Sequence, residues 1–182
     1  MVERRLVEAA QQGDEAAFSE IAFEISPRLF AIAQRILRDF HAAEDATQQA
    51  LVRIWRKLPS LSDIDKFDAW SYRVLVNECY AAGRRDRRRP TLVVVDESDA
   101  LSVDDAQAVV DRDMVERAFL RMPVEQRAVL TLVYYLELDH AEIAGILGVP
   151  IGTVKSRAFN GRNALRAALE ADLREGIGRW TA

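Results

Sequence analysis

A helical face rich in basic, hydroxyl and amide side chains, near the C-terminal end of the sequence, is the clearest candidate for a binding surface. Small or apolar residues recur every three or four positions between Ile151 and Leu165 and therefore share one face of a predicted helix. The opposite face carries Thr153, Lys155, Ser156, Asn160 and Arg162. Side chains of these types bind phosphates and base edges, so this helix has the shape and charge to enter the major groove of duplex DNA.

The residues before this helix predict a tight turn that joins it to a second helix. Ala144 is small enough to let two helices approach, Gly148 can adopt the positive φ that ends a helix, and Pro150 suits the start of the next one. The stretch 139–169 therefore predicts a helix-turn-helix. A purely structural helical corner shares part of this pattern and stays open as the alternative.

A second candidate surface combines aromatic residues with a run of arginines. Trp70, Tyr72, Arg73 and Asn77 precede the stretch 84–89, which holds five arginines and one acid. Arginines bind phosphates, aromatic rings stack on unpaired bases, and Asn reads base edges, so the pattern favours contact with nucleic acid. Trp70 taken alone is more typical of a helix core.

A third polar cluster lies at the start of a predicted amphipathic helix over 42–58. It contains Glu44, Asp45, Gln48, Gln49, Arg53 and Arg56. Acidic residues near a helix N-terminus interact favourably with the helix dipole and need no partner. These residues alone therefore favour an ordinary helix start.

The remaining hydrophobic periodicity predicts helices and no strands. In the N-terminal part we expect helices over 6–11, 15–24, from Pro27 to 37, 42–58 and 67–85. Further along we expect helices over 109–121 and 124–136, the helix-turn-helix, and a frayed tail past Leu173. The buried stripe of the 42–58 helix should consist of Ala46, Ala50, Ile54 and Leu58, and the 67–85 helix should pack Trp70, Val74 and Leu75 inward.

The net charge of −4 is unevenly distributed along the 182 residues. Residues 1–90 and 115–182 each carry +1, whereas residues 91–114 carry −6. The acidic stretch is therefore the predicted domain boundary, and a solvated linker is its simplest interpretation. Two alternatives stay open: its charge could occupy a basic groove in place of nucleic acid, or Val93-Val94-Val95 could form a short extended piece against a partner.

Composition excludes several classes of protein. The single cysteine, Cys79, excludes an internal disulfide and a multi-cysteine zinc site, and two histidines make a histidine-rich metal site unexpected. No apolar run has the length of a membrane span, and the first residues contain no apolar signal core. No recognisable set of acid, base, nucleophile and metal ligands is present. We expect a cytoplasmic protein with no cofactor, no metal and no enzymatic activity.

Three motifs, in this order along the chain, resemble those of the extracytoplasmic-function (ECF) sigma factors, which are small bacterial transcription initiation subunits. Ala43-Glu44-Asp45-x-x-Gln48 is similar to the family's polymerase-binding signature. Phe67-Asp-Ala-Trp70-x-Tyr72-Arg73-x-x-x-Asn77 resembles the helix that engages the melted −10 strand. The stretch 142–157, which ends in Lys155-Ser156-Arg157, resembles the helix that reads the −35 element in duplex DNA. The similarity covers about 10–89 and 112–170.

The resemblance implies an all-α chain of two helical domains. Residues 1–90 would form a region 2-like domain, 91–113 an acidic linker, 114–174 a region 4-like helix-turn-helix domain, and 175–182 a frayed tail. The implied partners are core RNA polymerase, through the clamp coiled coil of its largest subunit and the flap of its second-largest subunit, and promoter DNA, duplex at −35 and single-stranded at −10. An anti-sigma factor would hold the chain inactive until a signal releases it, without membrane insertion.

The resemblance also assigns residues to these contacts. Those expected to bind core polymerase are Glu44, Asp45, Gln48, Gln49 and Arg53. Those expected at the −10 strand are Ser60, Asp63, Lys66, Trp70, Tyr72, Arg73, Asn77, Arg84 and Arg85. Those expected at the −35 element are Gly152, Thr153, Lys155, Ser156, Arg157, Asn160 and Arg162.

The sequence departs from the family pattern at Ala81, where an acid is usual, at Gly83, where a large apolar residue is common, and at Asn160-Gly161. Because these positions lie in or beside the −10 and −35 motifs, they leave the family assignment unchanged but leave the base preference at both promoter elements open. Two other classes of function stay open: a helix-turn-helix repressor or activator that acts without polymerase, and a helical interaction protein or RNA-processing enzyme. Whether the purified chain binds a promoter alone or only with core polymerase discriminates the first of these from a sigma factor.

Overall fold

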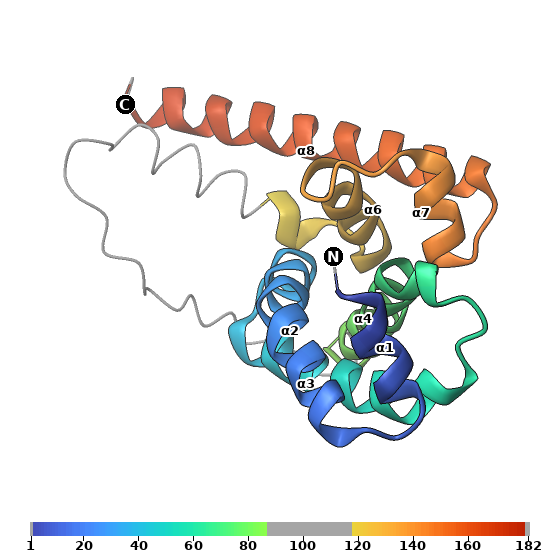
Figure 1. Cartoon of the computed structure of the whole chain (residues 1–182). Coiled ribbons are helices and arrows are strands. Elements are labelled where there is room, and N and C mark those ends of the chain that lie inside the picture. The colour runs from blue at the N-terminus through green and yellow to red at the C-terminus, as the bar shows by residue number, and fades with distance from the viewer. Residues whose placement is uncertain (1, 87–117, 181–182) are drawn as a thin grey trace.

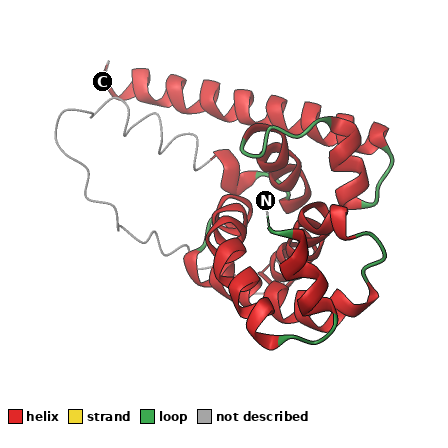
Figure 2. Ribbon diagram, in the orientation of Figure 1, coloured by secondary structure: helices red, strands yellow, loops and turns green. Residues whose placement is uncertain are grey.

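The computed structural model describes residues 2–86 and 118–180, with the side chains of 86 and 172–180 left aside. Every regular element in these two ranges is a helix (Figure 2). The predicted all-α class is therefore confirmed for the described part of the chain. The helix predicted over 109–121 lies mostly outside the described residues, which include only its last turn, ending at Arg121.

Two helices open the N-terminal half, α1 (Arg4–Gln11) and α2 (Glu15–Leu37). Asp14 caps α2 by accepting hydrogen bonds from the backbone N–H groups of residues 16 and 17. The predicted break at Pro27 is wrong, because α2 continues through it. Pro27 is exposed, so the carbonyl that loses its helical partner, one turn earlier at Phe23, faces solvent and can bond to water.

The N-terminal half is completed by α3 (Phe40–Lys57), two short 3-10 turns, η1 (Leu58–Ser60) and η2 (Ile64–Lys66), and α4 (Phe67–Asp86). The predicted stripe is confirmed, since Ala46, Ala50 and Ile54 on α3 and Leu58 at the start of η1 are all buried. On α4, Val74 and Leu75 are buried as predicted, while Trp70 is only partly buried.

The C-terminal half contains α6 (Val124–Tyr134), α7 (His140–Leu147) and α8 (Ile151–Trp180). Asp139 and Glu142 form a capping box at the start of α7, and Gly148 ends that helix with a φ of 64°. The predicted helix-turn-helix is thus confirmed as α7, turn and α8. Helix α8 continues through the segment for which a frayed tail is predicted, as far as Trp180, because glycines weaken a helix but leave its hydrogen bonds intact.

The two halves pack against each other through one continuous core. Helices α6 and α7 lie over α2 and α4, and α8 runs across the top of the molecule (Figure 1). A Cβ added at Gly83 on α4 would lie 3.2 Å from the Cβ of Val124 on α6. One added at Gly148 would lie 2.8 Å from a guanidinium nitrogen of Arg73. We call this contact, made by Arg73 and Gly83 with Val124 and Gly148, the interdomain seam.

Candidate nucleic-acid and partner interfaces

The outer face of α8 is open to solvent along the predicted binding surface. Val154, Ala158 and Gly161 are buried beneath it, and Lys155 and Asn160 are exposed. Gly161 brings α8 close to α6, because a Cβ there would lie 3.0 Å from Cδ1 of Leu130. The departure at Gly161 therefore has a packing reason within the C-terminal half.

The other predicted residues of α8 have different surroundings. Ser156 is exposed and donates a hydrogen bond to the carbonyl of the partly buried Thr153 at 3.0 Å. Gly152 has open space around its missing Cβ. Arg157 is partly buried, and Arg162 lines a groove on the other side of α8. Five of the seven predicted residues are thus exposed, namely Gly152, Lys155, Ser156, Asn160 and Arg162, whereas Thr153 and Arg157 are partly buried.

Sequence reasoning missed one residue of this surface, Phe159. Its side chain is 57% exposed, beside Asn160 on the outer face of α8. An aromatic residue that falls outside the apolar periodicity of its helix was the signal that could have identified it.

From the end of η2 along α4, four predicted side chains form one exposed line. Lys66, at the end of η2, is followed by Arg73, Asn77 and Arg84 at helical spacing, and all four are exposed. Trp70 lies on the same side, partly buried, with its ring tilted against that of Phe67 at 6.1 Å between centroids. The structure therefore brings these predicted residues together on a single face.

Arg85 is also exposed, and its Nε donates to the carbonyl of Ala81 at 3.4 Å. Tyr72, by contrast, is buried. The guanidinium of Arg28 lies 5.2 Å from the centroid of its ring, and burial raises the pKa of its hydroxyl. The ring of Tyr72 is thus a packing group between α2 and α4, with no open face for a stacked base.

The loop between α3 and α4 carries the other predicted residues of this surface. The exposed Ser60 donates to the carbonyl of Lys57 at 2.7 Å. Asp63 caps η2 and pairs with Lys66 at 2.8 Å. The hydrogen bond between them lowers the pKa of Asp63 and raises that of Lys66. The two charges therefore neutralise each other locally.

The face of α3 opposite its buried stripe carries the predicted partner-binding residues. Glu44, Asp45, Gln48 and Gln49 are exposed there, beside Val52, an exposed apolar residue. This face of α3 therefore combines hydrogen-bonding groups with one exposed apolar side chain.

Arg53 behaves differently from its neighbours on α3. Its Nε pairs with the carboxylate of Glu78 on α4 at 2.7 Å, and the side chain of Glu78 is only 5% exposed. Sequence reasoning missed Glu78, although its spacing from Val74 and Leu75 places it on the buried face of α4. Arg53 thus fixes α3 to α4, in addition to presenting about half of its side chain to solvent.

The interdomain seam holds residues from both predicted DNA-binding surfaces. Arg73 contacts Gly148, the turn glycine of the helix-turn-helix. Tyr80 on α4 has a buried hydroxyl with no hydrogen-bond partner among the described residues. Burial raises the pKa of Tyr80 to about 12, and the positive charge of Arg157 on α8 partly opposes this rise. The two surfaces therefore meet at the seam, where sequence reasoning had placed no contact.

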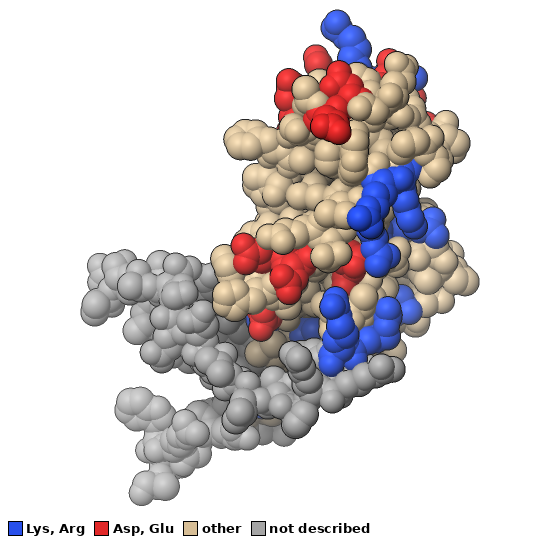
Figure 3. Space-filling view, turned by 90° about the horizontal axis from the view of Figure 1, so that it is seen from below, with Lys and Arg blue, Asp and Glu red and all other residues tan. Residues whose placement is uncertain are grey.

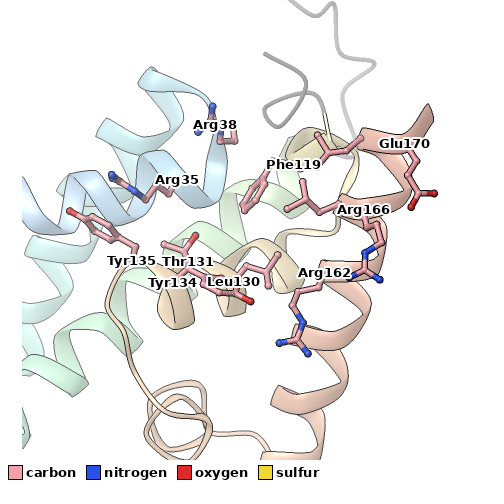
Figure 4. A pocket seen from close by; sticks show the side chains of 12 residues that line it. Arg35, Arg38, Phe119, Leu130, Thr131, Tyr134, Tyr135, Arg162, Arg166 and Glu170 are labelled. Atoms are coloured by element: carbon pink, nitrogen blue, oxygen red, sulfur yellow. The ribbon is translucent and has the colours of Figure 1, made fainter. Parts of the chain in front are cut away.

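A groove of about 660 Å³ lies between the end of α2, α6 and α8 (Figure 4). Its lining is mostly apolar with arginines around it: Arg35, Arg38, Phe119, Leu130, Thr131, Tyr134, Tyr135, Arg162, Leu165, Arg166, Leu169 and Glu170. Arg35 lies 3.7 Å from the centroid of the Tyr135 ring, so a cation–π contact ties the two halves at the mouth of the groove.

The charged side chains are unevenly spread over the surface. Seen from below, basic side chains gather along one side, and acidic ones form separate groups (Figure 3). Among the described residues, no group of three or more His, Cys, Asp or Glu side chains could hold a metal ion. No helix in those same ranges is long and apolar enough to cross a membrane.

Comparisons with known proteins agree on one family. Residues 24–89 match the model of Sigma-70 region 2, and residues 112–165 match that of Sigma-70, region 4. The chain is 30% identical to the RNA polymerase sigma-H factor of Pseudomonas aeruginosa, over 95% of this chain and 96% of the relative. It is 33% identical to the ECF RNA polymerase sigma factor SigM of Mycobacterium tuberculosis, over 90% and 83% respectively.

The fold of this chain is similar to that of the sigma factor RpoE from Bartonella quintana, which was solved in complex with the anti-sigma factor NepR. The TM-score is 0.61 at 25% identity, covering 85% of this chain and 98% of that one.

Proposed function

This chain belongs to the ECF RNA polymerase sigma factors, and from that premise we propose which of its surfaces direct core RNA polymerase to promoters. Residues 1–90 bind core polymerase and the melted −10 strand, 91–113 link the halves, and 114–174 read the −35 element. The chain acts in the cytoplasm as a specificity subunit and catalyses no reaction itself. The observation that carries this proposal is the pair of open faces, one on α4 and one on α8, each built of residues suited to its DNA target.

At the −35 element, α8 enters the major groove with its outer face. Lys155 and Ser156 bind phosphates, and Asn160 reads a base edge. Phe159 is suited to contact a thymine methyl group. Gly152 supports this role, since the open space around its missing Cβ lets the backbone approach a phosphate closely.

At the −10 element, the exposed line on α4 follows the melted strand. Arg73 and Arg84 bind its phosphates, while Asn77 and the loop 59–66 receive an extruded base. Capture of such a base offsets the few kcal/mol that its unstacking costs. Trp70 supplies the edge of an aromatic ring beside this line, and Tyr72 holds α4 in place from the core.

On the polymerase side, α3 docks on the clamp coiled coil of the largest subunit. Asp45, Gln48 and Gln49 offer hydrogen bonds around the apolar Val52, which adds a small apolar contact to this interface. Arg53 contributes mainly through its ion pair with Glu78, which fixes the angle between α3 and α4. The C-terminal half meets the flap of the second-largest subunit.

The packed arrangement of the two halves cannot serve both promoter elements at once. Elements named −35 and −10 lie about 25 base pairs apart, which is ~85 Å along duplex DNA. At the seam, however, the −10 residue Arg73 contacts the turn of the helix-turn-helix. The halves therefore separate at the seam when the chain joins polymerase.

We assign the groove to an anti-sigma factor, the class of partner with which the similar sigma factor RpoE was solved in complex. The groove contacts both halves, so a ligand there holds them together. Its apolar lining and the arginines Arg162 and Arg166 suit a helix with an apolar face flanked by acids. Such a helix would also cover Arg162, one of the predicted −35 residues.

Two double variants of the full chain test the proposal separately. Lys155→Ala with Asn160→Ala should weaken promoter binding by the holoenzyme at least ~10-fold, because the base contact of Asn160 contributes about 1–3 kcal/mol and the phosphate contact of Lys155 adds to it, while core binding stays unchanged. Asp45→Ala with Gln48→Ala should weaken core binding and leave duplex binding by the C-terminal half intact. Arg157 is avoided because of its position beside Tyr80.

The measurements are core binding by fluorescence anisotropy and transcription start mapping with reconstituted holoenzyme. If the α8 variant initiates as well as the unaltered chain, the assignment of the −35 surface is wrong. If the chain binds a promoter tightly without polymerase, a helix-turn-helix activator or repressor becomes the better description.

A further inference from the structure

Helix α1 lies against the back of the loop that joins α3 to α4. The side-chain amide of Gln11, in the last turn of α1, donates hydrogen bonds to two backbone carbonyls of that loop. The distances are 2.6 Å to the oxygen of Leu61 and 3.3 Å to that of Leu58. Gln11 is partly buried, so water competes weakly for these bonds.

A second contact joins the same two segments at the other end of the loop. The guanidinium of Arg4, in the first turn of α1, pairs with Asp65 at 2.6 Å and with Glu8 at 2.8 Å. Arg4 and Asp65 are both largely exposed, and exposed pairs hold a structure weakly. Gln11 is therefore the stronger of the two attachments.

The inner face of α1 is packed into the core, since Val7 and Ala10 are each 1% exposed. Gln11 follows Ala10 directly and ends the helix, so its amide projects from a fixed point. Within the same loop, Ser60 and Ser62 are exposed. The backbone of the loop is thus held by α1, while these side chains are accessible to a ligand.

We propose that Gln11 is a positioning residue for base recognition in the melted strand. By holding the carbonyls of Leu58 and Leu61, it fixes the backbone of 58–66 in the shape that accepts an unstacked base. A binding pocket selects among bases only when its walls are held by supporting contacts. Helix α1 precedes residue 24, where the match to region 2 begins, so this support comes from outside the matched stretch. The proposal rests on the role of the loop given above.

The test uses full-length Gln11→Leu, which keeps the size of the side chain and removes both donors. Gln12→Leu is the matched control, because Gln12 is the next residue, is exposed, and makes no bond to the loop. Gln11→Lys restores a donor of sufficient length and should recover the unaltered behaviour. Gln11→Glu, whose carboxylate faces two carbonyl oxygens, should be the most impaired.

Two readouts separate the possible outcomes. In the chain without polymerase, hydrogen exchange of the amides of 58–66 should quicken at least ~10-fold in Gln11→Leu, with α4 unchanged. In the holoenzyme, discrimination among bases on a promoter library randomised at the −10 element should fall at least ~5-fold, with core binding unchanged.

Unaltered exchange in the loop would overturn the anchoring role of Gln11. Altered exchange with intact base preference would overturn its role in recognition. Equal losses in Gln11→Leu and Gln12→Leu would also overturn the proposal. A wild-type holoenzyme with no base preference at −10 would instead refute the proposed function of the loop, and the exchange measurement would still decide the anchoring.

Discussion

A disulfide across the interdomain seam should make the activity of the chain depend on redox conditions. The change is Gly83→Cys together with Val124→Cys. The Cβ positions of these residues are 3.2 Å apart, whereas disulfides have Cβ atoms about 3.5–4.5 Å apart. A shift of a few tenths of an ångström at Val124 therefore allows the bond to form between α4 and α6.

The size of the expected effect follows from two distances. The bond keeps the two Cβ atoms within about 4.5 Å, whereas the surfaces must span elements ~85 Å apart along the promoter. Locked molecules should therefore be inactive at promoters that need both elements, and activity should fall in proportion to the crosslinked fraction. Closing a loop of about 40 residues should also stabilise the oxidised chain against unfolding by ~4 kcal/mol.

The assay is run-off transcription with reconstituted holoenzyme, before and after oxidation and again after reduction. The native Cys79 should not interfere, because burial raises its pKa to about 12 and keeps it as the unreactive thiol. Each single variant, oxidised in the same way, serves as a control. Reduction should return the double variant to full activity.

One result would refute the reasoning outright. If a preparation shown by mass to be fully crosslinked initiates transcription from a two-element promoter as well as its reduced form, the halves need not separate. If the crosslink fails to form while both thiols react readily with a labelling reagent, the seam is not closed in solution.

Two further predictions concern stability. Alanine favours a helix over glycine by ~1 kcal/mol, so Gly145→Ala on α7, with nothing within 4 Å of the new Cβ, should raise the free energy of unfolding by about that amount. Gly161→Ala should gain little stability or lose some, because its Cβ would crowd Leu130 and overpacking costs about 1–3 kcal/mol. If thermal unfolding shows both variants stabilised equally, the close packing of α6 against α8 is contradicted. The free energy of unfolding should also fall as pH rises from about 9 to about 12. Burial in the folded chain raises the pKa of Cys79 from 9.0 and that of Tyr80 from 10.0, each to about 12. Over this pH range the two groups therefore lose their protons in the unfolded chain first, which stabilises the unfolded state. Urea titrations across this window should show a loss of up to ~1.4 kcal/mol per pH unit for each group, and a Cys79→Ala variant with an undiminished slope would contradict it.

The helices and their ends were largely predictable because their signals are local. Asp14, Asp39 and Asp139 cap helices as residues of this type usually do, and Gly148 adopts the positive φ that the turn requires. Pro27 misled the prediction, since α2 continues through it although proline removes one helical hydrogen bond and disfavours a helix interior. The buried stripe of α3 was predictable for the same reason, from periodicity alone.

The contacts between helices were not predictable, because they depend on how distant segments meet. Nothing local in the sequence indicates that Gly83 meets Val124, or that Gln11 reaches the carbonyl of Leu61. Tyr72 was expected at a DNA surface because its type and motif fit, yet the tertiary arrangement buries its ring. A motif indicates which residues belong together, whereas packing decides which of them face outward.

The length of α8 gives the C-terminal half a lever arm. Its 30 residues span ~45 Å, and its first turns belong to the helix-turn-helix while its far end projects beyond α6 (Figure 1). A rigid rotation of only about 20° at the near end would carry the far tip through ~15 Å. The helix therefore converts small rotations of the DNA-reading half into large displacements of its tip. A spectroscopic label near that tip would follow these displacements in real time.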